Sequence, residues 1–192
     1  PMSQKSLNEQ RDQRLRNLEA LVERGFEAYP HGYDASHTAA ELHAQHPEPT
    51  PGQSIDAEPV SVAGRVMLLR MLGKLTFATL QDATGRIQVS FQKDQLEAYN
   101  ALKKVDLGDW LEVKGSLYVT KTGELTVGAT EFRPLVKSLR PLPDKHHGLV
   151  EKEARYRQRY LDLLVNPEVK RAFELRGRAI AYIRRYLDDL GF

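Results

Sequence analysis

The chain of 192 residues carries 28 basic and 26 acidic side chains, a formal net charge of +2, no cysteine and a mean hydropathy of −0.52. Without cysteine it can form neither a disulfide framework nor a cysteine-ligated metal site. No apolar run approaches the about 20 residues that cross a membrane, and the N-terminus has no apolar signal core, so we expect a soluble, cytoplasmic protein.

The first predicted element is an amphipathic helix over residues 6–26. Apolar side chains recur at three- and four-residue spacing after Leu15, and Gly25 follows where a helix end tolerates a left-handed backbone. The opposite face is rich in Arg and Glu, and we expect it to be solvated. The apolar stripe comprises Leu7, Leu15, Leu18, Leu21, Val22 and Phe26.

An acidic segment rich in His and Pro follows. Residues 31–58 contain five acidic side chains and no Lys or Arg. We expect Asp34 or Ser36 to cap a short helix around residues 38–45, which ends at the Pro- and Gly-rich stretch 47–52. Four of the six histidines also lie here. Because His43 and His46 have no convergent ligands nearby in the sequence, we predict no metal site.

Residues 59–136 are predicted to form an all-β domain. Five segments show period-two alternation, enrichment in Val, Ile, Thr and Phe, and Gly-containing turns; they span residues 59–72, 74–82, 86–93, 110–120 and 125–135. With a helix between the third and fourth strands, this order is that of the OB-fold, a five-stranded Greek-key barrel that binds single strands. Gly64 and Gly115 lie within strands, where a tightly coiled barrel requires a bend or a close backbone approach.

The hairpin KLTFATLQDATGRIQVSF, residues 74–91, offers a candidate binding surface. Strand alternation directs Ile87, Val89 and Phe91 inward and allows Phe77 and Gln88 to share the outer face. An exposed ring can stack on a base, which is worth roughly 1–3 kcal/mol. An amide beside it carries both donors and an acceptor, so it can read a Watson–Crick edge.

Two charged side chains near this hairpin are further candidates. Arg70 could pair with a phosphate or a base, and Glu124, in the turn KTGEL, could accept hydrogen bonds from a base with amino or imino donors. Residues 59–140 hold twelve basic against eight acidic side chains, a surplus typical of polyanion-binding domains. Periodicity alone also allows Phe77 to pack in the core, Gln88 to be solvated and Glu124 to be only a turn residue.

The remainder of the chain is predicted to be a linker followed by helices. The Pro-punctuated stretch KSLRPLPDKHHGL leads into a helix over 151–165, and a second helix over 166–192 begins with Asn166 as N-cap and Pro167 at the first helical position. Its apolar stripe needs a partner that the chain does not contain, which indicates truncation. We therefore expect Phe173 and Ile183 to be more exposed here than in a longer protein. The predicted regions are 1–58 (N-terminal helix and loop), 59–136 (barrel), 137–165 (hinge) and 166–192 (start of another domain).

Two strings resemble one enzyme family. LRPLPDKHHGLVEKEARYRQRYLDL, residues 139–163, is similar to the hinge between the anticodon-binding and catalytic domains of class II lysyl-tRNA synthetases of the bacterial type. VAGRVMLLRMLGKLTFATLQDATGRIQV, residues 62–89, resembles the OB-fold core of that family. The related aspartyl and asparaginyl enzymes share the barrel and the RYLDL ending, but their hinges do not resemble PLPDKHHGL.

The resemblance implies a role for each candidate residue. The barrel would bind the U-rich anticodon of the lysine tRNA. Phe77 matches the aromatic residue that stacks on the central U, and Gln88 and Arg70 match residues that contact the same base. Glu124 matches a loop acid placed near a neighbouring anticodon base.

The resemblance also indicates what the chain lacks. It ends just before motif 1, and nothing matches motifs 2 and 3, so we expect no catalytic residue, no metal and no cofactor here. ATP and Mg²⁺ would serve a parent enzyme, a homodimer whose catalytic domain and tRNA are the expected partners. The alternatives are a stand-alone OB-fold protein that binds single-stranded nucleic acid without ligase activity, and a fragment of an aspartyl or asparaginyl enzyme.

Overall fold

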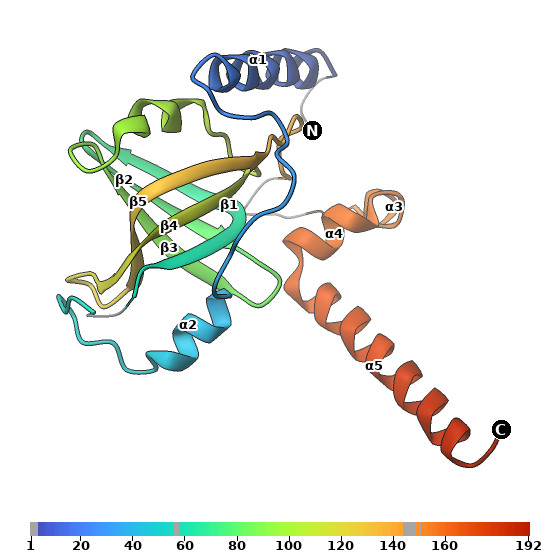
Figure 1. Cartoon of the computed structure of the whole chain (residues 1–192). Coiled ribbons are helices and arrows are strands. Elements are labelled where there is room, and N and C mark those ends of the chain that lie inside the picture. Colours follow the sequence, from blue (N-terminus) through green and yellow to red (C-terminus); the bar gives the residue numbers. More distant parts are fainter. Residues whose placement is uncertain (1–3, 56–57, 144–148, 150) are drawn as a thin grey trace. The chain divides into compact units, whose positions relative to one another are not determined.

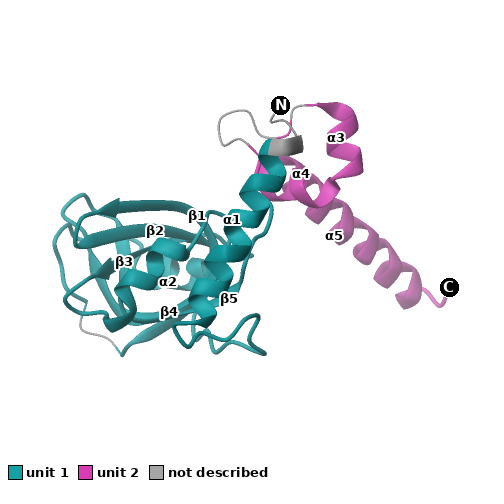
Figure 2. Ribbon diagram, turned by 90° about the horizontal axis from the view of Figure 1, so that it is seen from above, with its two compact units in different colours: residues 1–141 teal, residues 142–192 magenta. Residues whose placement is uncertain are grey.

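Two compact units make up the chain. The computed structural model describes residues 4–55, 58–143, 149 and 151–192. These residues divide into residues 1–141 and residues 142–192 (Figure 2). The DKHHG part of the hinge string, residues 144–148, lies outside the described residues, as does Val150. The four finer regions expected from the sequence stay predictions.

A closed five-stranded barrel is the centre of the first unit (Figure 1). The strands follow the order β1-β2-β3-β5-β4, and β1 also pairs with β4 to close the sheet. All pairs are antiparallel except β3 with β5, which is parallel. This arrangement confirms the predicted OB-fold, with a 3₁₀ helix, η1, where the sequence predicted a helix. The bounds are β1 (Val60–Leu72), β2 (Leu75–Gln81), β3 (Arg86–Gln92), η1 (Glu97–Lys104), β4 (Trp110–Val119) and β5 (Leu125–Val136).

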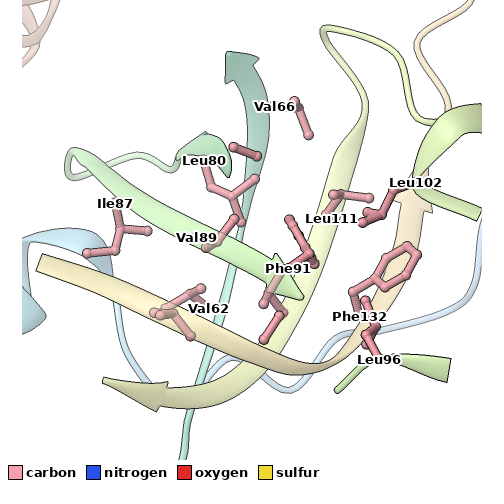
Figure 3. Packing of buried hydrophobic residues seen from close by; sticks show 14 of the residues in the cluster. Val62, Val66, Leu80, Ile87, Val89, Phe91, Leu96, Leu102, Leu111 and Phe132 are labelled. Atoms are coloured by element: carbon pink, nitrogen blue, oxygen red, sulfur yellow. The ribbon is translucent and has the colours of Figure 1, made fainter. Parts of the chain in front are cut away.

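The inward face of every strand supplies the core (Figure 3). Ile87, Val89 and Phe91 of β3 are all buried, as alternation predicted. The ring of Phe91 meets Phe132 of β5 edge to face, with centroids 5.7 Å apart, a favourable geometry for two aromatic quadrupoles. Leu102 of η1 is also buried in this cluster, so the 3₁₀ helix contributes to the core.

Gly115 allows two strands to approach closely. A Cβ atom built on Gly115 would lie 1.9 Å from the carbonyl oxygen of Gly128 on β5, far inside any allowed contact. The β4–β5 register shifts between Lys114 and Gly115, at the same place. Gly64 on β1 is tight as well, because its Cβ would lie 3.0 Å from the backbone oxygen of Gln81. The strand glycines thus mark close backbone approaches.

Helix α1 (Gln4–Val22) lies across one end of the barrel (Figure 1). Leu21 is buried there, but Val22 of the predicted apolar stripe is exposed. Arg14 and Asn17 are buried although the sequence assigned polar residues of this helix to solvent. They are buried because the surface beneath the helix offers them partners, which a one-dimensional apolar stripe does not reveal.

A buried polar cluster supplies those partners. Asn17 Nδ2 donates to Asp106 Oδ2 at 3.0 Å, and Arg14 Nη1 donates to the carbonyl oxygen of Ser138 at 2.6 Å. Lys137 Nζ donates to Asp109 Oδ2 at 2.7 Å and also pairs with Asp106. Burial opposes ionisation of Asp106, but the hydrogen bonds from Lys137 and Asn17 outweigh it and hold the pKa of this carboxyl below its usual value. The cluster joins α1 to the exit of β5.

Helix α2 (Ala39–Gln45) packs at the opposite end of the barrel (Figure 1). Its N-cap is Thr38, whose hydroxyl accepts from the Glu41 amide in a capping box, so the prediction that Asp34 or Ser36 caps this helix is wrong. Those two residues bind the barrel instead. The Asp34 amide donates to Glu112 Oε1 at 3.0 Å, and Ser36 Oγ accepts from the Ser61 amide at 2.9 Å.

The second unit contains three helices held together by one carboxylate. They are α3 (Lys152–Arg157), α4 (Arg159–Val165) and α5 (Pro167–Asp189). Asp162 is buried and accepts from Arg155 Nε at 3.0 Å and from Asn166 Nδ2 at 2.6 Å, and it pairs with Arg159. Asn166 does occupy the N-cap position of α5, but its side chain does not cap the helix. The buried carboxylate of Asp162 binds the side-chain amide of Asn166 more strongly than the free backbone amides at the start of α5 would.

Helix α5 leaves its apolar stripe uncovered. Phe173 is 43% exposed and Ile183 is 55% exposed. Both side chains are exposed as predicted, and the comparison with a longer protein stays a prediction. None of the helices in the described residues has the length and apolarity needed to cross a membrane.

The close approach at Gly115 gives a first prediction. Gly115→Ala should lower the free energy of unfolding by about 1–3 kcal/mol, because the added methyl group overlaps the backbone of β5. Gly128→Ala is the matched control, since its Cβ would meet no described atom closer than 3.5 Å. Urea unfolding followed by circular dichroism compares the two variants with the parent chain. Equal midpoints for both variants would contradict the close-approach explanation.

Candidate nucleic-acid interface

Strand register brings three of the four predicted site residues onto one outer face of the barrel. Arg70 of β1 pairs directly with Phe77 of β2, and Phe77 pairs with Ser90 of β3. In the next row, Gln88 lies between Thr79 of β2 and Thr126 of β5. Directly paired residues point to the same side of a sheet, so these side chains form one continuous surface. We call this surface the β-face, and we include in it Tyr118 of β4, which is described later in this subsection.

Phe77 lies on the β-face and outside the core. Its neighbours Thr76 and Ala78 are buried on the inner side, where the Thr76 hydroxyl meets Tyr99 OH at 2.9 Å. The ring of Phe77 is itself only partly buried. The interpretation that packs Phe77 in the core is therefore wrong, and the ring offers solvent a flat apolar surface.

Gln88 is partly buried and held by one neighbour. Its Nε2 atom donates to Thr126 Oγ1 at 2.9 Å. The Thr126 hydroxyl in turn donates to the backbone oxygen of Glu124 at 3.0 Å. Gln88 makes no other side-chain hydrogen bond to the part of the chain that the structure describes. A carbonyl oxygen and one amide hydrogen therefore remain for a ligand.

The two charged candidates lie at the borders of the β-face. Arg70 is exposed and forms no hydrogen bond or ion pair with any described residue. Glu124 is exposed in the turn between β4 and β5, where its amide donates to Thr120 Oγ1 at 3.0 Å. Glu124 precedes Thr126 in the chain, so it lies beside the row of the β-face that contains Gln88. Arg70 supplies positive charge at one border, and Glu124 an acceptor at the other.

Sequence reasoning missed three members of the β-face. Thr126 is fully buried beside Gln88, and Tyr118 OH donates to Ser90 Oγ at 3.0 Å. The ring of Tyr118 lies over Gly128, which has no side chain to displace it. Alternation alone puts Tyr118 and Thr126 outward, but it does not give the register in which β5 pairs with β3 and brings Thr126 to Gln88.

The turn between β2 and β3 fixes how the two site strands meet. Asp82 Oδ1 accepts from the amides of Thr84 and Gly85, at 2.7 and 2.8 Å, and Oδ2 accepts from the Ala39 amide at 2.7 Å. Burial of Asp82 opposes its ionisation, but these hydrogen bonds, first among them that from Ala39, hold its pKa below the usual value. One carboxylate thus ties the hairpin that carries Phe77 and Gln88 to α2.

The β-face has the chemistry of a nucleic-acid surface and lacks that of a metal centre. Within residues 4–55, 58–143, 149 and 151–192, no three His, Cys, Asp or Glu side chains gather where they could hold a metal ion. A partly exposed ring can stack on a base, the amide near it can read the edge of that base, and an arginine can neutralise a phosphate.

Comparison with known proteins agrees with this geometry. Residues 60–135 match the family of OB-fold nucleic acid binding domains. The whole chain aligns with the lysine–tRNA ligase of Deinococcus radiodurans at 48% identity over 202 residues, and with that of Magnetococcus marinus at 46% over 194 residues. The lysine–tRNA ligase of Yersinia enterocolitica is 46% identical over 191 residues, which cover 97% of the chain. The chain spans only 37% to 39% of the length of these three relatives.

The Asp82 turn gives a second prediction. Asp82→Ala should lower the free energy of unfolding by about 1–2 kcal/mol near neutral pH, because four donors lose their acceptor. The stability that this carboxylate contributes is fully present above the unfolded pKa, about 3.9, and is lost as the pH falls through the lower folded pKa. The difference between parent and variant should therefore be constant above about pH 5 and shrink below about pH 4.

Asp94→Ala is the matched control for this measurement. Asp94 makes only an exposed pair with Lys74, 3.5 Å apart, which is expected to contribute little. Urea unfolding at a series of pH values checks both variants. A difference between parent and Asp82→Ala that does not change down to pH 2 would contradict the assignment.

Proposed function

The chain belongs to the lysine–tRNA ligase family, and we propose that its barrel recognises the U-rich anticodon of the lysine tRNA as the N-terminal, anticodon-binding part of such an enzyme. The observation that carries the proposal is that Phe77 and Gln88 lie in adjacent rows of one outer face, within a chain that matches these ligases along its whole length. A barrel that served only as a scaffold would not need an exposed ring beside an oriented amide.

The proposed division of work follows from the chemistry of each side chain. Phe77 stacks on the central base and supplies affinity that is indifferent to base identity, because every base has a π-face. Gln88 supplies choice, because its amide matches only some base edges. Arg70 adds a contact to phosphate or to the same base, and Glu124 accepts from a donor on a neighbouring base.

The remaining activity belongs to the whole protein and is also part of the proposal. The parent enzyme would attach lysine to tRNA with ATP and Mg²⁺, as a cytoplasmic homodimer whose catalytic domain supplies the chemistry. The chain would contribute recognition, and its uncovered α5 would pack against that domain. The competing function is a stand-alone OB-fold protein that binds single strands without base preference and shows a steep dependence on salt.

Binding of an RNA stem-loop with UUU in its loop tests the proposal. Phe77→Ala should weaken binding about 5- to 100-fold by fluorescence anisotropy, since one stacked base contributes roughly 1–3 kcal/mol. Gln88→Ala should reduce the preference for U over C at the central position and have a smaller effect on affinity. Each variant is measured with both loops at one salt concentration, because such affinities depend on salt.

Two control variants remove the same kinds of side chain, an aromatic ring and an amide, at positions outside the β-face. Tyr33→Ala deletes an aromatic ring that is 63% exposed on the N-terminal segment, and Gln45→Ala deletes an exposed amide at the end of α2. Both should bind like the parent chain. If the parent chain bound the U and C loops equally, anticodon reading would be excluded and the stand-alone function supported.

The proposed role of Arg70 is tested by salt. Arg70→Gln should weaken binding to the U loop and the C loop and reduce the slope of log K against log salt by roughly 0.7 to 1, as expected for the loss of one phosphate contact. An unchanged slope with altered base preference would assign Arg70 to a base instead. Titrations between low and moderate potassium chloride distinguish the two outcomes.

A further inference from the structure

We propose that Thr126 is a positioning residue that sets which end of the Gln88 amide faces the bound base. The inference rests on the proposed function and adds a determinant of base choice that touches no base itself. Thr126 is fully buried, and its hydroxyl accepts from the Gln88 amide beside it on the β-face. The two residues are 38 positions apart in the sequence and meet only through the parallel pairing of β3 with β5.

The direction of the amide follows from counting hydrogens. A threonine hydroxyl has one hydrogen to donate and two lone pairs to accept with. The backbone oxygen of Glu124 can only accept, so the hydrogen of Thr126 Oγ1 is committed to it across 3.0 Å. Toward Gln88 the hydroxyl therefore presents lone pairs, and only the NH₂ end of the amide can bind there. The carbonyl end of Gln88 must turn the other way.

The orientation selects a class of base edge. A carbonyl oxygen directed at the ligand accepts from an imino N–H, which uracil has at N3 and guanine at N1. Cytosine and adenine carry an unprotonated ring nitrogen at the corresponding place, so two lone pairs would face each other. The reversed amide would favour those two bases instead. One buried hydroxyl thus makes the site prefer an imino donor.

The hydroxyl also couples base choice to the β4–β5 turn. Its acceptor, the backbone oxygen of Glu124, also accepts from the Thr120 amide at 3.0 Å. The turn is closed further by Gly123, whose amide donates to the Thr120 carbonyl and whose φ of +87° suits glycine. The turn therefore places the carbonyl that takes up the hydroxyl hydrogen.

Three variants of the full chain test the proposal. Thr126→Val keeps the buried shape but removes the hydroxyl, so the Gln88 amide can turn either way. Thr126→Ser restores the hydroxyl. Thr79→Val is the matched control, because Thr79 is the neighbour of Gln88 on the other side and its hydroxyl bonds to no described residue. Thermal melting monitors folding of each variant.

The measurement is the ratio of affinities for stem-loops that differ only at the central loop base, U, C or N3-methyluridine. One neutral hydrogen bond contributes a factor of about 3 to 10, so Thr126→Val should lower the ratio of U to C affinities by that factor. The penalty for N3-methylation should shrink in parallel. Thr126→Ser and Thr79→Val should keep the parent ratios.

The outcomes separate the two proposals. If the parent chain prefers U and Thr126→Val prefers it equally, the positioning role is overturned and anticodon recognition stands. If Thr126→Val weakens binding to all loops by the same factor, Thr126 has only a structural role, which also overturns the inference. If the parent chain itself shows no preference, the proposed function fails before the inference is reached.

Discussion

The parallel pairing of β3 with β5 is the constraint on which the rest of the first unit depends. It joins the strands β1, β2 and β3 to the hairpin of β4 and β5, and together with the β1–β4 pairing it makes a closed barrel in which the inward side chains of all five strands enclose one core. The same pairing makes the outer surface continuous from Arg70 on β1 to Tyr118 on β4. Without it, Gln88 would have no Thr126 beside it and the amide would turn freely. Closure of the core and order on the β-face thus have one cause.

Polar contacts fix the positions of the helices and turns outside the barrel strands, which apolar packing alone would not determine. Asp82 ties the β2–β3 turn to the start of α2, and Lys137 with Asp106 and Asp109 ties α1 to the end of β5. Directional hydrogen bonds in a buried site specify one arrangement, because an unpaired member would be costly. Asp162 has the same function among the helices of the second unit.

In the proposed function, the β-face assigns affinity and base choice to different side chains. Phe77 presents a ring that any base can cover, whereas Gln88 presents one acceptor whose direction is set by a neighbour. Such a division lets a single small surface bind tightly without losing discrimination. The apolar stripe of α5 is a different kind of surface, broad and without directional groups, as expected of a helix that packs on another domain.

Alternation and turn residues in the sequence predicted the five strands and their order along the chain, and they allowed Phe77 and Gln88 to share one face, because side chains alternate between the two sides of a strand. Which side of the sheet faces the core was decided by the tertiary structure. The hinge and barrel strings were enough to indicate the family. Only the tertiary structure decided that Thr126 lies beside Gln88, that Arg14 and Asn17 are buried, and that Thr38 caps α2. It also decided that Asn166 turns to Asp162. For Thr126, Arg14 and Asn17 the physical reason is that a polar side chain takes the partner that folding brings to it, and the position of that partner depends on strand pairing and helix packing between distant segments. Thr38 and Asn166 bind partners three and four residues away, and the sequence offers other local choices for each.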